Sequence, residues 1–351
     1  MKKTTVGRLD FLQEFENFNK AILKGKRLKK DGCKINPGSL KKFESTCNLL
    51  KRFSVEKQFP LRIKIVQKNK RELNQEKFYW KRFYTKFTDY LYHDLDCYDN
   101  YVGSVVKDIR TFFNYLIKEK NLSIGNFHSQ FFIFKEDIQI LTLQPEQLKS
   151  LIYITNNKKL RPSLLKVKDI LVAGCTVALR YSDLMNLRKA NFQFFNQQYY
   201  LRAQSKKTGI YTDIKLPPYA IEIFKKYSKK SNRLLPYFNV GRLNKYLKEL
   251  AELMGWTDEV VKTRQKRGKA LIIYKDHKKK NHFRFCDLVS SHIMRRTAIT
   301  TMLRYEMPEH LVRKISGHAP NSTEFHKYVS IAQKYLDKET DKVFEKLRAG
   351  I

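Results

Sequence analysis

The chain has 351 residues, 42% of them hydrophobic and 13% aromatic, so it can bury the cores of two or three domains and is not a disordered tail. Its 71 Lys and Arg residues against 34 Asp and Glu give a formal net charge of +37. That excess predicts a polyanionic partner, with nucleic acid ahead of a membrane surface or a ribosome.

Five cysteines are present, an odd number with no C-x-x-C pair, which argues against a disulfide framework or a zinc site. The first residues lack the apolar core of a signal peptide, and no stretch approaches the roughly 18 apolar residues of a membrane span. We therefore expect a cytoplasmic protein with reduced thiols.

Apolar residues recur at helical spacing through the first third of the chain, over 9–23, 40–53, 80–91 and 102–116. The pattern predicts helices joined by basic connections, with Ser39 as the cap of the second helix. We assign the aromatic residues to a helical core. The neighbouring Lys and Arg side chains form either a solvated face or phosphate contacts.

Residues 121–140 show few periodic signals, and we interpret them as an interdomain linker. They separate a helical domain at 1–120 from a second domain at 141–351, in which Pro145 is expected to begin the first helix. The second domain mixes element types. We expect a long buried helix at 164–188, a β-hairpin at 198–216 with Gly209 in its turn, helices near 219–228 and 241–254, a basic, partly β stretch at 262–284, and helices from there to the C terminus.

Three segments of the second domain stand out by the chemistry of their side chains. They are Ala178-Leu179-Arg180-Tyr181-Ser182-Asp183-Leu184, Ser291-His292-Ile293-Met294-Arg295, and Ser316-Gly317-His318 with Tyr328 ten residues further on. Each alone has an ordinary explanation, such as a salt bridge, a helix-end cap or a core aromatic residue. With a lysine of the hairpin turn, the set supplies the groups needed to cleave a phosphodiester without a metal ion.

Phosphoryl transfer places extra negative charge on the non-bridging oxygens, and the planar fork of Arg binds two such oxygens at once. Arg180 and Arg295 can therefore replace the divalent ions of other nucleases. His292 lies three residues before Arg295, so on a helix both face the same phosphate. Gly317 is expected to end a helix at 308–316 and to leave His318 at its end.

The candidate nucleophile is Tyr328. A phenol has a pKa near 10, so a tyrosyl phosphodiester has a better leaving group than an alkyl ester. A DNA 5′-hydroxyl can then reverse the link without ATP. The departing 5′-oxygen needs a proton, which a lysine of the hairpin can supply.

These residues resemble the tyrosine recombinase (phage integrase) family, and within it the integrases of bacteroidete mobile elements, over most of the chain. The family's G-L-R-x-S-E/D-L box is similar to 178–184, its H-x-x-R box to 292–295 and its L-G-H box to 316–318. Its hairpin lysine corresponds to Lys207, with Lys206 as the competing position. Ala178 replaces the family's glycine. The interval from His318 to Tyr328 is ten residues where nine is usual, so the register of the nucleophile needs a test.

The resemblance implies a mainly α fold with a small β-sheet. It implies two domains in a C-shaped DNA clamp, with a helical core-binding domain and a mixed α/β catalytic domain that ends in a tail helix. Catalysis would need no cofactor or metal and would use Arg180, Lys207, His292, Arg295, His318 and Tyr328. The implied partners are double-stranded DNA and a homotetramer on two synapsed sites, with a monomer in free solution left open. The tail helix docks on a neighbouring subunit in the family, and packing in cis is the alternative.

The implied reaction is site-specific recombination through a 3′-phosphotyrosine and a Holliday junction. A type IB topoisomerase and a catalytically silent DNA-binding relative are the alternatives. The target DNA, and the choice among integration, inversion and chromosome resolution, are not encoded in any pattern recognised in the sequence.

Overall fold

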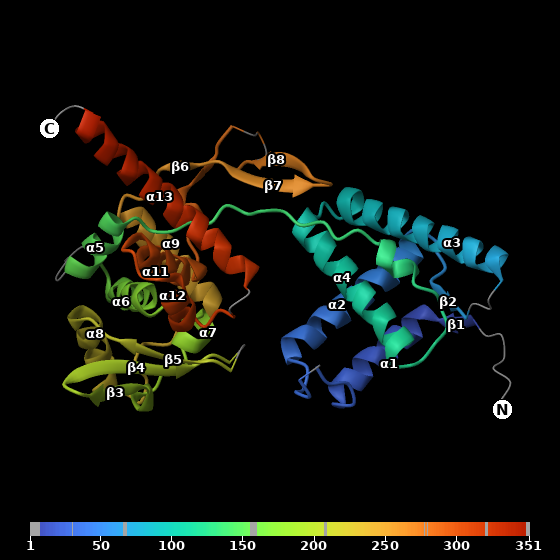
Figure 1. The fold of residues 1–351 in the computed structure, drawn as a ribbon, viewed down its shortest axis with the longest axis horizontal. Helices are drawn as coiled ribbons and strands as arrows, with labels where there is room; N and C mark the ends of the chain where they lie inside the picture. Colours follow the sequence, from blue (N-terminus) through green and yellow to red (C-terminus); the bar gives the residue numbers. More distant parts are fainter. Residues whose placement is uncertain are drawn as a thin grey trace. The chain divides into compact units, whose positions relative to one another are not determined.

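The computed structural model describes residues 8–29, 31–65, 69–154, 160–206, 209–276, 278, 280–319 and 322–348, without the side chains of 333–336, 338 and 339. The chain forms two compact units, and one of them is discontinuous in sequence. The first unit comprises 1–138 and 263–273, and the second comprises 139–262 and 274–351. The fold is mainly α-helical with small sheets, as predicted (Figure 1). No helix of the described part is both long and apolar enough to cross a membrane.

Helices form most of the first unit. Its elements in the N-terminal part are β1 (Arg8–Asp10), α1 (Phe11–Leu23), α2 (Pro37–Glu56), β2 (Arg62–Lys64), α3 (Lys70–Asp89), the π-helical turn η1 (Tyr90–Asp94), α4 (Asp99–Lys118) and the 3₁₀ turn η2 (Phe127–Gln130). The strands β1 and β2 pair antiparallel, with Leu9 opposite Ile63.

Aromatic side chains fill the core of this unit, as predicted. Trp80, Phe83 and Phe87 of α3 are 1–2% exposed, and Phe112 of α4 is fully buried. The rings meet at tilted and edge-on angles, for example Trp80 against Phe113 at a centroid distance of 4.8 Å and 89°. Such geometry adds stabilisation beyond the buried area.

The predicted cap of α2 was wrong by three residues. Asn36 is the N-cap, and its Oδ1 accepts from the backbone N–H of Gly38 at 2.8 Å. Pro37 occupies the first helical position, where its fixed φ and its missing N–H cost nothing. Ser39 therefore lies inside the first turn.

Much of the predicted linker packs into the first unit. Ile124, His128, Phe131 and Glu136 are each 2–3% exposed. The His128 ring stacks on Phe113 at 5.1 Å with an interplanar angle of 5°, and burial lowers the pKa of this imidazole to about 4. Only the stretch after residue 138 lies outside the unit.

The second unit mixes helices with a three-stranded antiparallel sheet of order β3-β4-β5. Its elements are α5 (Pro145–Tyr153), α6 (Pro162–Val177), α7 (Tyr181–Leu184), η3 (Lys189–Asn191), β3 (Phe192–Phe195), β4 (Gln198–Gln204), β5 (Tyr211–Lys215), α8 (Pro218–Ser228), α9 (Val240–Leu253), β6 (Glu259–Val260), β9 (Phe283–Arg284), α10 (Phe285–Leu288), α11 (His292–Arg304), α12 (Glu309–Ser316) and α13 (Thr323–Arg348).

The predicted hairpin is present as β4 and β5, with Leu201 opposite Ile214 and Arg202 opposite Asp213. Leu201 and Ile214 face the core, whereas the neighbours on the other face are exposed. The sheet lies beneath α6 and α11 in the view of Figure 1.

The helix predicted at 164–188 is wrong beyond Val177. Ala178 adopts the left-handed conformation, with φ 54° and ψ 15°, and ends α6. Arg180 then caps the short helix α7. A buried apolar run has no period that reveals such a break, and the residue at the break is alanine rather than glycine.

The helices α6 and α11 cross closely, because Gly174 has no side chain at the crossing. A Cβ on Gly174 would lie 2.5 Å from Sδ and 2.9 Å from Cβ of Met294. This approach fixes α11 against the end of α6, from which Arg180 emerges.

Candidate active site

The left-handed turn at the end of α6 positions Arg180. The side chain is half-buried, and its Nη1 donates to Oγ of Ser205 at 2.9 Å. Ser205 is 6% exposed and directly follows β4. The sheet therefore supports the first arginine of the predicted set.

Arg295 and His318 are in direct contact, although 23 residues separate them in sequence. Arg295 is 6% exposed in α11, and its Nη1 donates to the carbonyl of Ala178 at 3.0 Å. Its Nη2 lies 3.1 Å from Nε2 of His318. Gly317, with φ 62°, ends α12 as predicted and places His318 just after the helix.

Positive charge and burial dominate the electrostatics of this cluster. Burial first, then the charge of Arg180, lowers the pKa of Arg295 to about 10. Burial, followed by the charges of Arg295, Arg180 and Arg313, lowers the pKa of His318 to about 3. The imidazole is therefore neutral at neutral pH. An anion between the guanidiniums would relieve their mutual repulsion.

Tyr328 lies on α13, beside His318. The two rings are 6.0 Å apart between centroids, at 54°. Phe325, one turn earlier, is fully buried and packs against both rings at 5.4 and 6.2 Å. The structure thus brings Tyr328 to the Arg295–His318 pair despite the ten-residue interval.

His292 is the first residue of α11, one turn before Arg295, and its side chain is exposed. The backbone N–H of the preceding Ser291 donates to Oδ1 of Asn244 at 2.8 Å. Asn244 of α9 therefore anchors the start of α11.

The predicted general acid, Lys207, lies outside the described residues, as does Thr208. Its competitor Lys206 has an exposed side chain, and its backbone N–H lies 3.3 Å from Oδ1 of the buried Asp183. The backbone at Lys206 is thereby attached to the segment that contains Arg180.

Two supporting residues were not assigned roles from the sequence. Ser205 bonds Arg180, and Ser316 lies 2.8 Å from Nδ1 of His318. Ser205 directly precedes the two candidate lysines, which is the only signal in the sequence that marks it.

The comparison with protein families decides the membership of the chain. A family model described as the phage integrase family matches residues 142–334, which is more than half of the 351 residues. The chain belongs to the phage integrase family. It is thus a tyrosine recombinase, as the three boxes predicted. No curated protein matched the sequence.

Solved structures of this family share the fold at low sequence identity. A lambda integrase dimer bound to a COC′ core site matches with a TM-score of 0.58 and 10% identity, over 92% of this chain and 77% of that one. The Tn1549 transposon integrase in complex with transposon right end DNA gives 0.56 and 13%, over 94% and 99%. XerH site-specific recombinase bound to palindromic difH substrate gives 0.54 and 14%, over 95% and 96%. At these identities the likeness concerns the fold.

Proposed function

We propose that this tyrosine recombinase cuts and rejoins DNA at specific sites through a covalent link between Tyr328 and a 3′-phosphate. The observation that supports this most directly is the convergence of Arg295, His318 and Tyr328 from two helices and a helix end. Arg180 acts electrostatically on the same cluster. Two buried or half-buried guanidiniums around a neutral imidazole suit one phosphodiester better than any neutral substrate.

In the cleavage step, Oη of Tyr328 attacks the scissile phosphorus. A bond from phosphorus to the phenolic oxygen forms, and the bond to the 5′-oxygen breaks. Arg180 and Arg295 neutralise the extra charge on the non-bridging oxygens. Lys207 gives its proton to the 5′-oxygen, and His318 and His292 assist by orienting groups and accepting the phenolic proton.

The low pKa of His318 suits this role once DNA is present. A bound phosphate offsets the charges of Arg295 and Arg180, which are among the causes that hold the pKa of His318 to about 3. Its pKa therefore rises on binding, and the imidazole becomes a better acceptor for the phenolic proton. Attack by a 5′-hydroxyl then reverses the step, so no ATP is consumed.

The remaining parts of the proposal follow from the resemblance and the charge. The first unit (1–138 and 263–273) and the second (139–262 and 274–351) form a C-shaped clamp on duplex DNA, and the net charge of +37 favours phosphate contacts. Four protomers synapse two sites and exchange strands through a Holliday junction. The resemblance to integrases of bacteroidete mobile elements favours the attachment site of such an element as the substrate.

The tail helix has the exposed apolar residues that docking in trans requires. On α13, Val343, Phe344 and Leu347 are 56%, 63% and 68% exposed. We propose that this end of the helix contacts a neighbouring protomer on DNA.

A nicked suicide substrate tests the chemistry. DNA that flanks the gene supplies candidate attachment sites. Each substrate carries a nick close to the scissile phosphate, so that cleavage releases a short fragment with the 5′-hydroxyl, which diffuses away and cannot rejoin. In EDTA and without ATP, we expect a covalent protein–DNA adduct on a denaturing gel. The label is on the DNA strand whose 3′-phosphate is joined to the protein. Absence of an adduct from every flanking site would argue against the enzymatic proposal.

Tyr328→Phe should remove the adduct and leave DNA binding unchanged. Tyr305→Phe is the matched control, because Tyr305 is 63% exposed in the same unit. An adduct that persists in Tyr328→Phe would overturn the choice of nucleophile but not the reaction.

A further inference from the structure

A segment of the second half of the sequence completes the first unit. Residues 263–273 follow α9 and precede α10 in sequence, but they pack with residues 1–138. They include most of β7 (Lys262–Lys266) and all of β8 (Lys269–Ile273). Arg267 and Gly268 between the strands have φ 50° and 77°, the left-handed pair of a type I′ turn. We call residues 263–273 the inserted hairpin.

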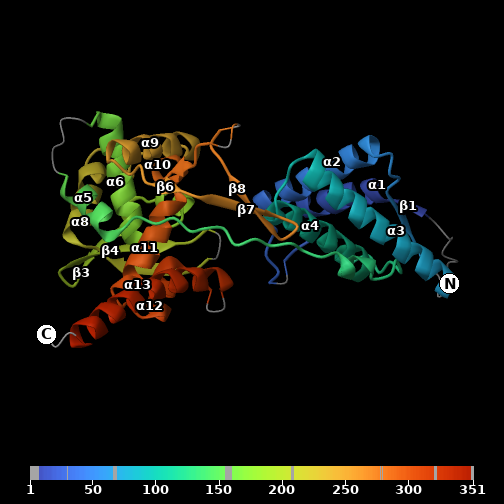
Figure 2. The ribbon, with the colours of Figure 1, turned by 90° about the horizontal axis from the view of Figure 1, so that it is seen from above.

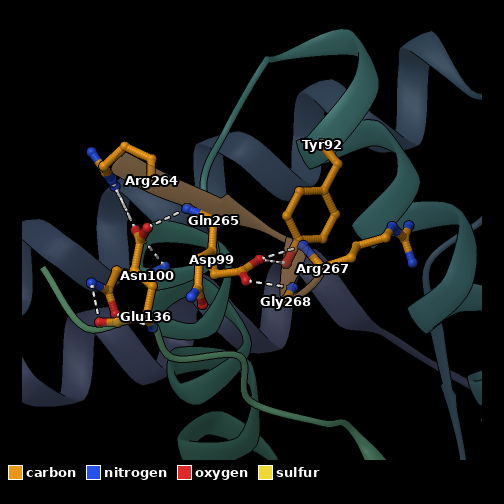
Figure 3. A network of polar contacts seen from close by, with 8 residues as sticks. All are labelled: Tyr92, Asp99, Asn100, Glu136, Arg264, Gln265, Arg267 and Gly268. Atoms are coloured by element: carbon orange, nitrogen blue, oxygen red, sulfur yellow. Dashed lines mark hydrogen bonds and ion pairs between the residues drawn. The ribbon is translucent and has the colours of Figure 1, made fainter. Parts of the chain in front are cut away.

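One buried carboxylate of the first unit binds strand β7. Glu136 is 2% exposed and accepts from Nε and Nη2 of Arg264 at 3.0 and 2.7 Å, and from the backbone N–H of Gln265 at 2.6 Å (Figure 3). Burial alone would raise the pKa of Glu136. The bonds from Arg264, Gln265 and Asn100 outweigh burial and leave that pKa below its ordinary value.

A second buried carboxylate binds the turn. Asp99, at the start of α4, is 1% exposed. It accepts from the backbone N–H groups of Arg267 and Gly268 at 2.7 and 2.8 Å, and from the Tyr92 hydroxyl at 2.6 Å (Figure 3). Undocking of the hairpin would remove two of these three donors from a buried carboxylate, which is costly.

The cations of the hairpin also bind groups of the first unit. The guanidinium of Arg264 lies 4.4 Å and the ammonium of Lys266 5.4 Å from the centre of the Tyr98 ring. Arg267 lies 4.9 Å above the Tyr92 ring and pairs with Asp89, and Lys266 pairs with Asp96. Much of the charge in this basic stretch is thus directed at the protein's own carboxylates rather than at DNA.

The hairpin also meets the end of the N-terminal segment. The first passage of the chain between the units follows residue 138, and Glu136 lies two residues before it. The second passage precedes residue 263, one residue before Arg264, which is bonded to Glu136. The chain passes between the units three times. Near two of these passages, the residues that belong to the first unit are therefore bonded to each other. Figures 1 and 2 both show the hairpin beside the extended chain that leads away from η2.

We propose that the inserted hairpin is a brace that restricts the movement of the second unit relative to the first, with Asp99 and Glu136 as its positioning residues. A single extended linker leaves rotation about its backbone bonds free, whereas a docked second connection removes part of that freedom. If the chain binds DNA as proposed, units that are ordered in advance lose less entropy on binding. Only this consequence rests on the proposed function.

The test uses the full chain without DNA, so its outcome does not depend on recombination. Glu136→Gln and Asp99→Asn keep the side-chain shape and remove the charge. Glu76→Gln is the matched control, because Glu76 is also 2% exposed, lies in the same unit and is bound at 2.7 and 2.9 Å by the two terminal nitrogens of one arginine, Arg62 of β2.

Two quantities are measured. The first is amide hydrogen exchange of residues 263–273, which reports docking through the N–H groups of Gln265, Arg267 and Gly268. The second is the distribution of distances between spin labels at exposed positions 75 and 196, with Cys33 and Cys97 replaced by Ser. Loss of a hydrogen bond to a charged group should accelerate exchange of the hairpin roughly tenfold to a hundredfold. We expect this in both test variants, together with a broader distance distribution, and neither change in Glu76→Gln.

Replacement of residues 264–272 by Gly-Ser-Gly supplies a second variant that leaves Asp99 and Glu136 in place. Its distance distribution should broaden as well. An unchanged distribution in this variant, or in variants whose hairpin exchanges faster, would overturn the brace. Adduct formation by a variant with a broadened distribution would leave the proposed chemistry untouched.

Discussion

Nη2 of Arg295 lies 3.1 Å from Nε2 of His318. A guanidinium only donates, so it can bond only a ring nitrogen that carries no proton. The other nitrogen, Nδ1, lies 2.8 Å from Oγ of Ser316, and that hydroxyl lies 2.7 Å from the carbonyl of Val312, to which it donates. Nη2 lies 3.3 Å from Nδ1 as well, so this guanidinium requires at least one unprotonated ring nitrogen, which is the neutral form of His318.

The first prediction follows from this neutral imidazole. His318 has a pKa of about 3 in the folded protein, against an ordinary value near 6.5. Below pH 6.5 the unfolded chain binds a proton that the folded chain does not. The unfolding free energy contributed by this group therefore falls as pH drops from about 6.5 toward 3, by up to about 1.4 kcal/mol per pH unit. Urea unfolding over that range should show a shallower slope in His318→Asn.

His310→Asn is the control for this measurement, because His310 lies exposed on α12. It should keep the slope of the unaltered protein. Equal slopes in His318→Asn and in the unaltered protein would show that His318 is not buried in its neutral form.

The second prediction concerns the alanine that ends α6. Ala178 has φ 54°, a conformation that costs a non-glycine residue about 1–2 kcal/mol. Glycine removes that cost but adds about 0.5–1 kcal/mol of backbone entropy loss. The change also removes a fully buried methyl group, worth about 0.8 kcal/mol, so we expect Ala178→Gly to leave the unfolding free energy within about 0.8 kcal/mol of its original value. Ala173→Gly, inside the same helix, should lower it by about 1 kcal/mol or more. Equal destabilisation by the two changes would contradict the left-handed assignment, because both remove a buried methyl group and only the backbone conformation differs.

Ala178 also shows where sequence reasoning reached its limit. The helical cores, the β4–β5 hairpin and the end of α12 at Gly317 were predicted, because each has a periodic pattern or a glycine signal. The break after Val177 has neither. The three boxes predicted the cluster of Arg295, His318 and Tyr328 through their shared chemistry and the family resemblance, because no local spacing brings α11, the end of α12 and α13 together.

A basic, partly β stretch was expected at 262–284, but the packing of the inserted hairpin with the first unit escaped prediction for a different reason. Its basic residues form an ordinary charge run in sequence, and their partners Asp99 and Glu136 lie more than a hundred residues earlier. Nothing local distinguishes a lysine or arginine that binds DNA from one that binds a carboxylate of the same chain. Only the three-dimensional pairing separates the two.

The third prediction tests the crossing of α6 and α11. A methyl group on Gly174 would lie 2.5 Å from Sδ and 2.9 Å from Cβ of Met294, and the helix fixes the latter atom. Gly174→Ala should therefore lower the unfolding free energy by about 1–3 kcal/mol. Met294→Ala removes two of the three close atoms, Sδ and Cγ, and keeps Cβ, so the double variant should lose less stability than the two single changes added together. A double-mutant cycle measured by chemical denaturation gives this coupling, and strict additivity would contradict the close approach.

The fourth prediction separates the two candidate general acids. Lys206→Ala and Lys207→Ala each remove one ammonium, and the residue that protonates the 5′-oxygen should be the one whose loss slows cleavage by about 10²–10⁴-fold. We expect this for Lys207.

Sulfur in place of the bridging 5′-oxygen turns the leaving group into a thiol with a pKa near 8.5, which departs readily without a proton. Cleavage of that substrate by Lys207→Ala should therefore approach the rate of the unaltered protein. Arg295→Ala is the control, because lost stabilisation of the non-bridging oxygens is not repaired by a better leaving group. Rescue of Lys206→Ala instead would move the general acid by one residue, to the position whose backbone N–H contacts Asp183.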